Sequence, residues 1–142
     1  MKDDQACTQI GNRKGKLDML KKVMVVDDSA LIHQMYKMAL MRYKCTIIPA
    51  KDGQAALDLL SKHPDIDLIL LDINMPVMGG LEFLQKVKKI DSYSKIPIII
   101  QSTEGKEDDT KRGLELGATA YITKPIQTAD LHALIEKIVP ST

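Results

Sequence analysis

Two segments in the middle of the chain, residues 68–71 and 98–100, consist only of leucine and isoleucine. A strand with one face in water alternates apolar and polar residues, whereas a strand covered on both faces does not. Uninterrupted runs of this length therefore predict central strands of a parallel sheet with helices on both faces. Such a sheet needs a crossover helix between consecutive strands.

The rest of the chain alternates between segments with the pattern of strands and segments with the pattern of helices. The expected strands are residues 22–27, 45–49, 68–72, 96–101 and 118–122. The segments between them have helical period, with expected starts at Ser29, Asp52 and Gly80 and an expected stop at Gly117. Five such units predict an α/β fold with a doubly wound, five-stranded parallel sheet.

Length and composition limit the function classes. The chain has 142 residues, 44% hydrophobic and 27% charged, which suits one domain with a sizeable core. Its net charge of +1 leaves no basic footprint for nucleic acid. No apolar run approaches the roughly 20 residues of a membrane helix. The two cysteines, Cys7 and Cys45, form no disulfide framework and suit a reducing cytoplasm.

The first 20 residues differ from the rest. They are mostly polar up to about Lys16 and contain Gly11 and Gly15. This composition predicts a flexible N-terminal extension over residues 1–20, followed by the folded domain over 21–142. A small amphipathic helix starting near Leu17 is the alternative.

Polar residues follow four of the expected strands. Asp27-Asp28-Ser29 ends the first strand, Asp72 the third, Ser102-Thr103 the fourth and Thr123-Lys124-Pro125 the fifth. The carboxyl ends of parallel strands meet at one edge of the sheet, so these residues are expected to form one site. Three carboxylates in one crevice repel each other unless a hard cation such as Mg²⁺ neutralises them.

A lysine and a hydroxyl beside such a cluster suit phosphoryl transfer to a carboxylate. Asp72 is then the nucleophile, Lys124 pairs with the phosphoryl group and Ser102 donates a hydrogen bond to it. Thr103 adjoins Ser102 and offers the same group, but strand alternation favours Ser102.

These motifs together resemble the receiver domains of bacterial response regulators, the CheY-like family, over about residues 22–139. The matching segments are Val25-Val26-Asp27-Asp28-Ser29, Leu70-Leu71-Asp72-Ile73-Asn74-Met75-Pro76-Val77-Met78-Gly79-Gly80, Pro97-Ile98-Ile99-Ile100-Gln101-Ser102 and Gly117-Ala118-Thr119-Ala120-Tyr121-Ile122-Thr123-Lys124-Pro125. The resemblance implies a flavodoxin-like sheet with strand order 2-1-3-4-5.

The resemblance also assigns the metal site and the acceptor. Asp72 is the phosphoacceptor, and Asp28, Asp72 and the main-chain carbonyl of Asn74 bind Mg²⁺ directly. Asp27 acts mainly through metal-bound water. The peptide bond between Lys124 and Pro125 is commonly cis in the family.

The resemblance further implies a switch. Phosphorylation draws Ser102 and Tyr121 inward and reshapes the surface of the last two helices and the fifth strand, through which a partner or a homodimer would read the signal. Tyr121 could instead be a simple core aromatic. Asn74 and Glu104 would set the rate of dephosphorylation. The implied partners are a sensor histidine kinase or phosphotransfer protein and a downstream protein target; the chain ends at Thr142, which favours a single-domain regulator.

Two other functions compete with this interpretation. One is a phosphatase or transferase of the haloacid dehalogenase type, but such enzymes need an Asp-x-Asp motif after the first strand, where this chain has adjacent aspartates. The other is a receiver-like scaffold that is never phosphorylated; such proteins usually lack one of the acidic or lysine positions that are present here. The pathway stays open, because Ile73 and Gln101 differ from the best-known chemotaxis regulator.

Overall fold

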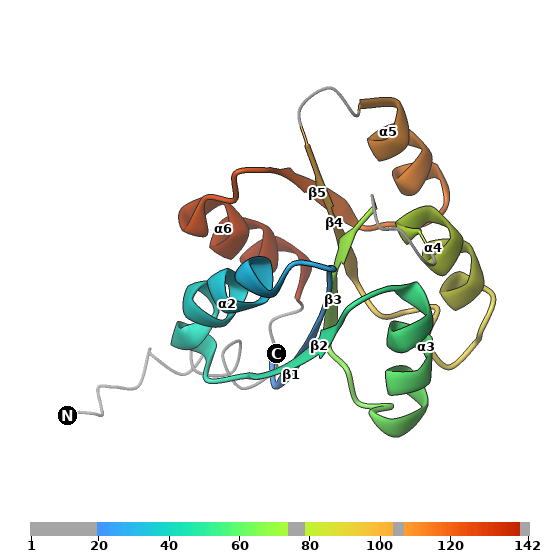
Figure 1. Ribbon diagram of the computed structural model, residues 1–142, viewed down its shortest axis with the longest axis horizontal. Coiled ribbons are helices and arrows are strands. Elements are labelled where there is room, and N and C mark those ends of the chain that lie inside the picture. The colour runs from blue at the N-terminus through green and yellow to red at the C-terminus, as the bar shows by residue number, and fades with distance from the viewer. Residues whose placement is uncertain (1–19, 74–78, 104–106, 140–142) are drawn as a thin grey trace.

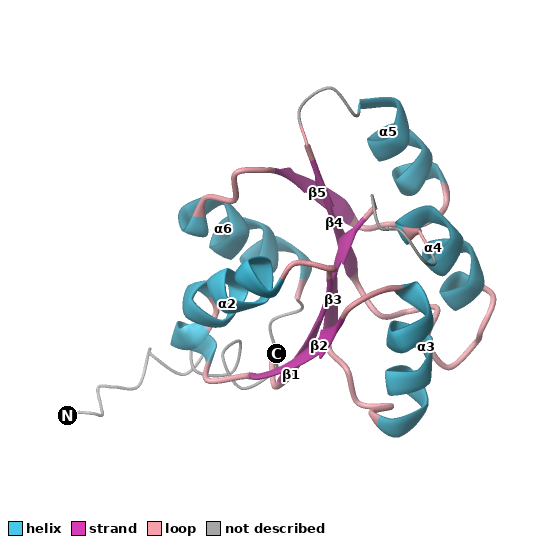
Figure 2. Ribbon diagram, in the orientation of Figure 1, coloured by secondary structure: helices cyan, strands magenta, loops and turns pink. Residues whose placement is uncertain are grey.

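The computed structural model describes residues 20–73, 79–103 and 107–139, which form a five-stranded parallel sheet with helices on both faces (Figures 1 and 2). The strands are β1 (Lys22–Val26), β2 (Thr46–Ala50), β3 (Leu68–Asp72), β4 (Ile98–Ser102) and β5 (Ala120–Thr123). The helices are α2 (Ala30–Ala39), η2 (Met41–Tyr43), α3 (Gly53–Lys62), α4 (Gly80–Lys88), α5 (Glu107–Glu115) and α6 (Thr128–Ile138). The sheet order β2-β1-β3-β4-β5 confirms the doubly wound fold.

The core lies in two layers, one on each face of the sheet. Helices α2 and α6 cover one face, and α3, α4 and α5 cover the other (Figure 2). Alternate residues of β1 enter opposite layers: Val23 and Val25 pack on the α2/α6 side, and Met24 and Val26 on the α3/α4 side. All residues of β3 and β4 are buried, as their uninterrupted apolar runs predicted.

Several helix boundaries follow the predicted signals. The Ser29 hydroxyl accepts a hydrogen bond from the Ile32 backbone N–H at 3.3 Å, and Asp52 caps α3 in the same way. Gly117 follows α5 with a φ of 115°, a conformation that favours glycine.

Two strands begin two residues later than expected. Residues 96–97 and 118–119 precede β4 and β5 instead of belonging to them. Ile96 and Ala118 are buried, but the Ile96 N–H bonds to the Tyr93 carbonyl in the preceding turn and the Ala118 N–H bonds to the Gly113 carbonyl of α5. Apolar residues at these two positions therefore indicate burial in the core and not the start of a strand.

The structure describes only the last residue of the predicted N-terminal extension. Residues 1–19 lie outside the described residues, so the extension and its helical alternative stay predictions. Leu20 is buried in the core layer under α2 and α6. Within the described segments, none of the helices has the length and apolarity needed to cross a membrane.

Candidate functional site

Sheet register brings the strand-end residues together. Val26 pairs with Leu71 on the neighbouring strand, and Asp72 pairs with Gln101 on the next. The preceding residues of the same parity, such as Val25 and Leu70, face α2 and α6. Because side chains alternate along a strand, Asp72 and Gln101 face that side too, and Asp27 continues the pattern just beyond β1.

Three carboxylates form the centre of the site. Asp27, Asp28 and Asp72 each offer an oxygen, and these oxygens lie within 4.8 Å of one another. Asp27 is 1% exposed and Asp72 4%, whereas Asp28 is exposed. Two like charges at such a distance repel by roughly 3 kcal/mol at an effective dielectric constant of about 20. A small oxygen-loving cation would offset this repulsion, so the donor set fits Mg²⁺.

Lys124 supplies positive charge between the two buried carboxylates. Its Nζ lies 3.7 Å from Asp27 Oδ2 and 3.6 Å from Asp72 Oδ2. Both distances exceed the usual range of a hydrogen bond. The lysine is therefore placed by both carboxylates but tightly bound to neither. The Lys124–Pro125 peptide bond is cis, as the resemblance implied.

Asp27 is held from several directions. Its Oδ1 accepts the Ser29 backbone N–H at 2.8 Å, and its Oδ2 accepts a long hydrogen bond of 3.4 Å from Gln101 Nε2. Its main-chain carbonyl lies 2.7 Å from His33 Nε2, so that ring nitrogen carries the proton. His33 therefore packs directly against the site.

Tyr36 adds a buried hydroxyl to the same side of the sheet. The hydroxyl has no hydrogen-bond partner among the described residues. Burial raises the pKa of Tyr36 well above its usual value, and the negative charges of Asp27 and Asp72 raise it further. This hydroxyl therefore stays protonated and lies within the electric field of the carboxylates.

Sequence reasoning missed both Gln101 and Tyr36 as site residues. The available signal was Gln101 itself, an amide at the end of an isoleucine run that is otherwise wholly apolar. Tyr36 offered no such signal, because an aromatic residue on the apolar face of a helix is ordinary core.

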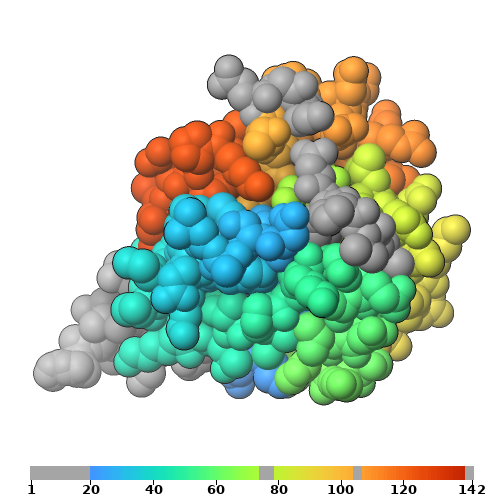
Figure 3. Space-filling model, in the orientation of Figure 1, coloured from blue at the N-terminus to red at the C-terminus, as the bar shows by residue number. Residues whose placement is uncertain are grey.

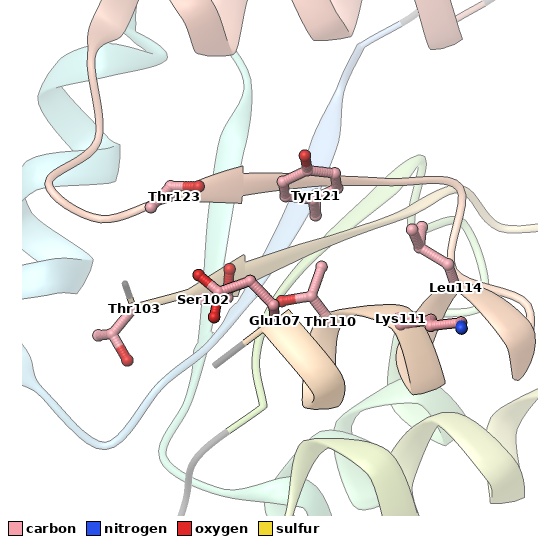
Figure 4. A pocket seen from close by; sticks show the side chains of 8 residues that line it. All are labelled: Ser102, Thr103, Glu107, Thr110, Lys111, Leu114, Tyr121 and Thr123. Atoms are coloured by element: carbon pink, nitrogen blue, oxygen red, sulfur yellow. The ribbon is translucent and has the colours of Figure 1, made fainter. Parts of the chain in front are cut away.

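The expected switch residues lie on β4 and β5. Ser102 is buried and the adjoining Thr103 is exposed. Ser102 shares the parity of Ile100, so it points to the α3/α4/α5 side of β4, whereas Gln101 faces the acidic cluster. The choice of Ser102 as the hydroxyl that contacts the phosphoryl group therefore stays a prediction. Tyr121 is 49% exposed, so the alternative that it is a core aromatic is wrong. A cavity of about 330 Å³ lies against both Ser102 and Tyr121, with Thr110 and Leu114 of α5 in its wall (Figure 4).

Asn74 and Glu104 lie outside the described residues. Their assigned roles in metal binding and dephosphorylation therefore stay predictions.

Comparison with known proteins decides the family. The sequence pattern of the response regulator receiver domain matches residues 23–136. The chain belongs to the response regulator receiver family. It is 35% identical over 119 residues to a chemotaxis protein CheY homolog of Campylobacter jejuni, covering 83% of this chain and 92% of that protein.

Other receiver proteins show the same likeness. The two-component response regulator ORR11 of rice, Oryza sativa subsp. indica, is 33% identical over 118 residues, covering 83% of this chain and 80% of that protein. The solved structure of the chemotaxis regulator CheY4 of Vibrio cholerae has a TM-score of 0.76 at 34% identity, covering 84% of this chain and 98% of that chain.

Family membership places the protein in two-component signalling. Receiver domains generally bind Mg²⁺ at an acidic pocket and interact with histidine kinases or phosphotransfer proteins. The cluster of Asp27, Asp28 and Asp72 is the acidic pocket of this receiver that corresponds to that chemistry.

Proposed function

We propose that this receiver domain accepts a phosphoryl group on Asp72 in the presence of Mg²⁺ and thereby acts as a response-regulator switch. The observation that carries the proposal is the cluster of three carboxylates with a single lysine between the two buried ones. Such a cluster attracts a divalent cation and a phosphoryl group together, because each reduces the repulsion that the other would face.

The transfer itself needs few protein groups. A carboxylate oxygen of Asp72 forms a bond to the phosphorus of a phosphohistidine, the phosphorus–nitrogen bond breaks, and the imidazole leaves with the bonding electron pair. Asp27 and Asp28 would hold Mg²⁺ with Asp72, and the cation would supply charge neutralisation at the transferring oxygens. Lys124 would then move from the two carboxylates to the phosphoryl group.

The switch would run through Ser102 and Tyr121. Phosphorylation adds roughly −1.5 to −2 charge and new acceptor oxygens at Asp72. Ser102 would donate a hydrogen bond to this group, and Tyr121 would turn from solvent into the cavity next to Ser102, which has about 330 Å³ of space. The changed surface would be that of α5, β5 and α6, for a downstream protein partner or a homodimer.

Helix α2 offers a docking surface for the phosphoryl donor. Leu31, Met38 and Met41 on α2 and η2 are 76%, 67% and 67% exposed. Figure 3 shows this segment, in blue to cyan, between α6 and α3. Leu31 and Met38 are two turns apart on α2 and share one face of the helix, and exposed apolar patches of this kind mark interaction surfaces. Leu31 lies beside the acidic pocket in the sequence, so a donor protein seated there would reach Asp72.

The decisive experiment is labelling with acetyl phosphate, with and without Mg²⁺, read on a phosphate-affinity gel. The native protein and Asp58→Asn, an exposed control on α3, should each gain one phosphoryl group only with Mg²⁺. Asp72→Asn should gain none. Equal labelling of Asp72→Asn would reject the acceptor assignment, and no labelling of the native protein would favour the scaffold alternative.

A further inference from the structure

We propose that Gln101 is a positioning residue that keeps the cation pocket open by holding Asp27 Oδ2 in competition with Lys124. This inference rests on the proposed function. It concerns a residue that lies beneath the acidic cluster and contacts one of its carboxylates.

The location of Gln101 demands a compensating interaction. Its side chain is fully buried, at 0% exposure, directly after the three isoleucines of β4, which pack into both core layers. Burying an amide without a partner costs about 1–3 kcal/mol. Its register places it beside Asp72, on the face that also carries Asp27.

The chemistry of the carboxylate sets the orientation of the amide. A carboxylate only accepts hydrogen bonds, so the NH₂ group of Gln101 must point towards Asp27. The opposite atom, Gln101 Oε1, is buried and has no hydrogen-bond partner among the described residues. Among the described residues, the side-chain amide of Gln101 therefore has one hydrogen-bond partner, Asp27.

The amide and Lys124 meet at the same oxygen. Gln101 Nε2 lies 3.4 Å from Asp27 Oδ2, and Lys124 Nζ lies 3.7 Å from it. A neutral donor on that oxygen reduces the attraction that draws the ammonium inward. Without the amide, the flexible lysine is free to close a shorter ion pair with Asp27.

A closed ion pair would weaken cation binding. Lys124 would then neutralise charge that Mg²⁺ must otherwise neutralise, and the ammonium would have to be displaced first. We expect Gln101→Met, which keeps the side-chain volume but removes the amide, to raise the Kd for Mg²⁺ roughly five-fold. Without Mg²⁺, the melting temperature of Gln101→Met should stay close to that of the native protein.

The test is a double-mutant cycle read by calorimetric Mg²⁺ titration. It uses the native protein, Gln101→Met, Lys124→Met and the double variant, with Gln85→Met on the exposed side of α4 as the matched control. Gln101→Met should weaken Mg²⁺ binding only when Lys124 is present. Gln85→Met should change nothing. Unchanged affinity in Gln101→Met, or an equal loss with and without Lys124, would overturn the proposal.

A measurement on the native protein covers the case that Gln101→Met does not fold. The side-chain amide signals of Gln101 in a ¹⁵N NMR titration should shift on addition of Mg²⁺, while those of Gln85 should not. An unmoved Gln101 amide would reject the proposal. If the native protein binds no Mg²⁺, the proposed function fails as well, whereas Mg²⁺ binding that ignores Gln101 rejects this inference alone.

Discussion

Charged residues at the amino end of the sheet are paired with close partners, whereas those at the carboxyl end cluster as like charges. At the amino end, Asp67 Oδ2 accepts the backbone N–H groups of Lys21 and Lys22 at 2.7 and 3.0 Å, and Lys22 Nζ lies 3.0 Å from Asp65. At the carboxyl end, three carboxylates share a cluster in which Lys124 approaches no closer than 3.6 Å to the buried pair.

This difference separates groups that stabilise the fold from groups that serve the proposed reaction. The charges of Asp67, Lys22 and Asp65 at the amino end have close partners. The partly buried Lys88 amine, whose pKa burial lowers, likewise donates to the carbonyls of Ser94 and Ile96. The carboxyl end instead gathers like charges that a folded protein would otherwise avoid. Substitutions at the two ends should therefore differ in sign as well as in size.

The largest expected effect is steric and lies directly behind the acidic cluster. A Cβ at position 80 would collide with the backbone of Asp72 and Ile73, so Gly80→Ala should lower the free energy of unfolding by about 3 kcal/mol. Gly113→Ala would meet only the end of the Ile100 side chain, which can move, and should cost about 1 kcal/mol. Urea denaturation of both variants checks the order; a smaller loss in Gly80→Ala would contradict this account of the packing.

The second effect tests the amino end. Asp67→Asn should lower the free energy of unfolding by about 2 kcal/mol, because the carboxylate oxygen that accepts two backbone N–H groups loses its charge. Urea denaturation at neutral pH measures this loss. An unchanged midpoint would mean that Asp67 does not organise this end of the sheet.

The third effect concerns the buried hydroxyl beneath the carboxyl end. Tyr36→Phe removes a group without a hydrogen-bond partner in the described part of the chain and should raise the free energy of unfolding by about 1 kcal/mol. Tyr43→Phe is the control: its hydroxyl donates to Glu136 at 3.3 Å, so the same change should lower stability. If Tyr36→Phe is the more destabilising of the two in urea denaturation, its hydroxyl has a partner.

The smallest effect reverses sign with the cation. Asp28 is the exposed member of the cluster, so Asp28→Asn should raise the free energy of unfolding by only about 0.5 kcal/mol in EDTA. In Mg²⁺ the native protein should become the more stable of the two, because it binds the cation more tightly. Thermal unfolding in both buffers provides the comparison. The same order in both buffers would remove Asp28 from the metal site.

Several parts of the fold and site were predictable because their signals are local. Ser29 and Asp52 cap their helices through bonds to residues three positions away, and Gly117 occupies the conformation that its position required. The two late strand starts were not predictable. The N–H groups of Ile96 and Ala118 bond to a preceding turn and to the end of α5, and apolar periodicity does not reveal such bonds.

The order of residues along the chain was enough to place Asp27, Asp72 and Lys124 at strand ends. These positions follow from the pattern of apolar and polar residues along short segments of the chain. Tertiary structure alone decided that Lys124 lies between two buried carboxylates and that Gln101 reaches Asp27. Those distances join residues up to 97 positions apart in the numbering and depend on which strands become neighbours once the crossover helices have packed.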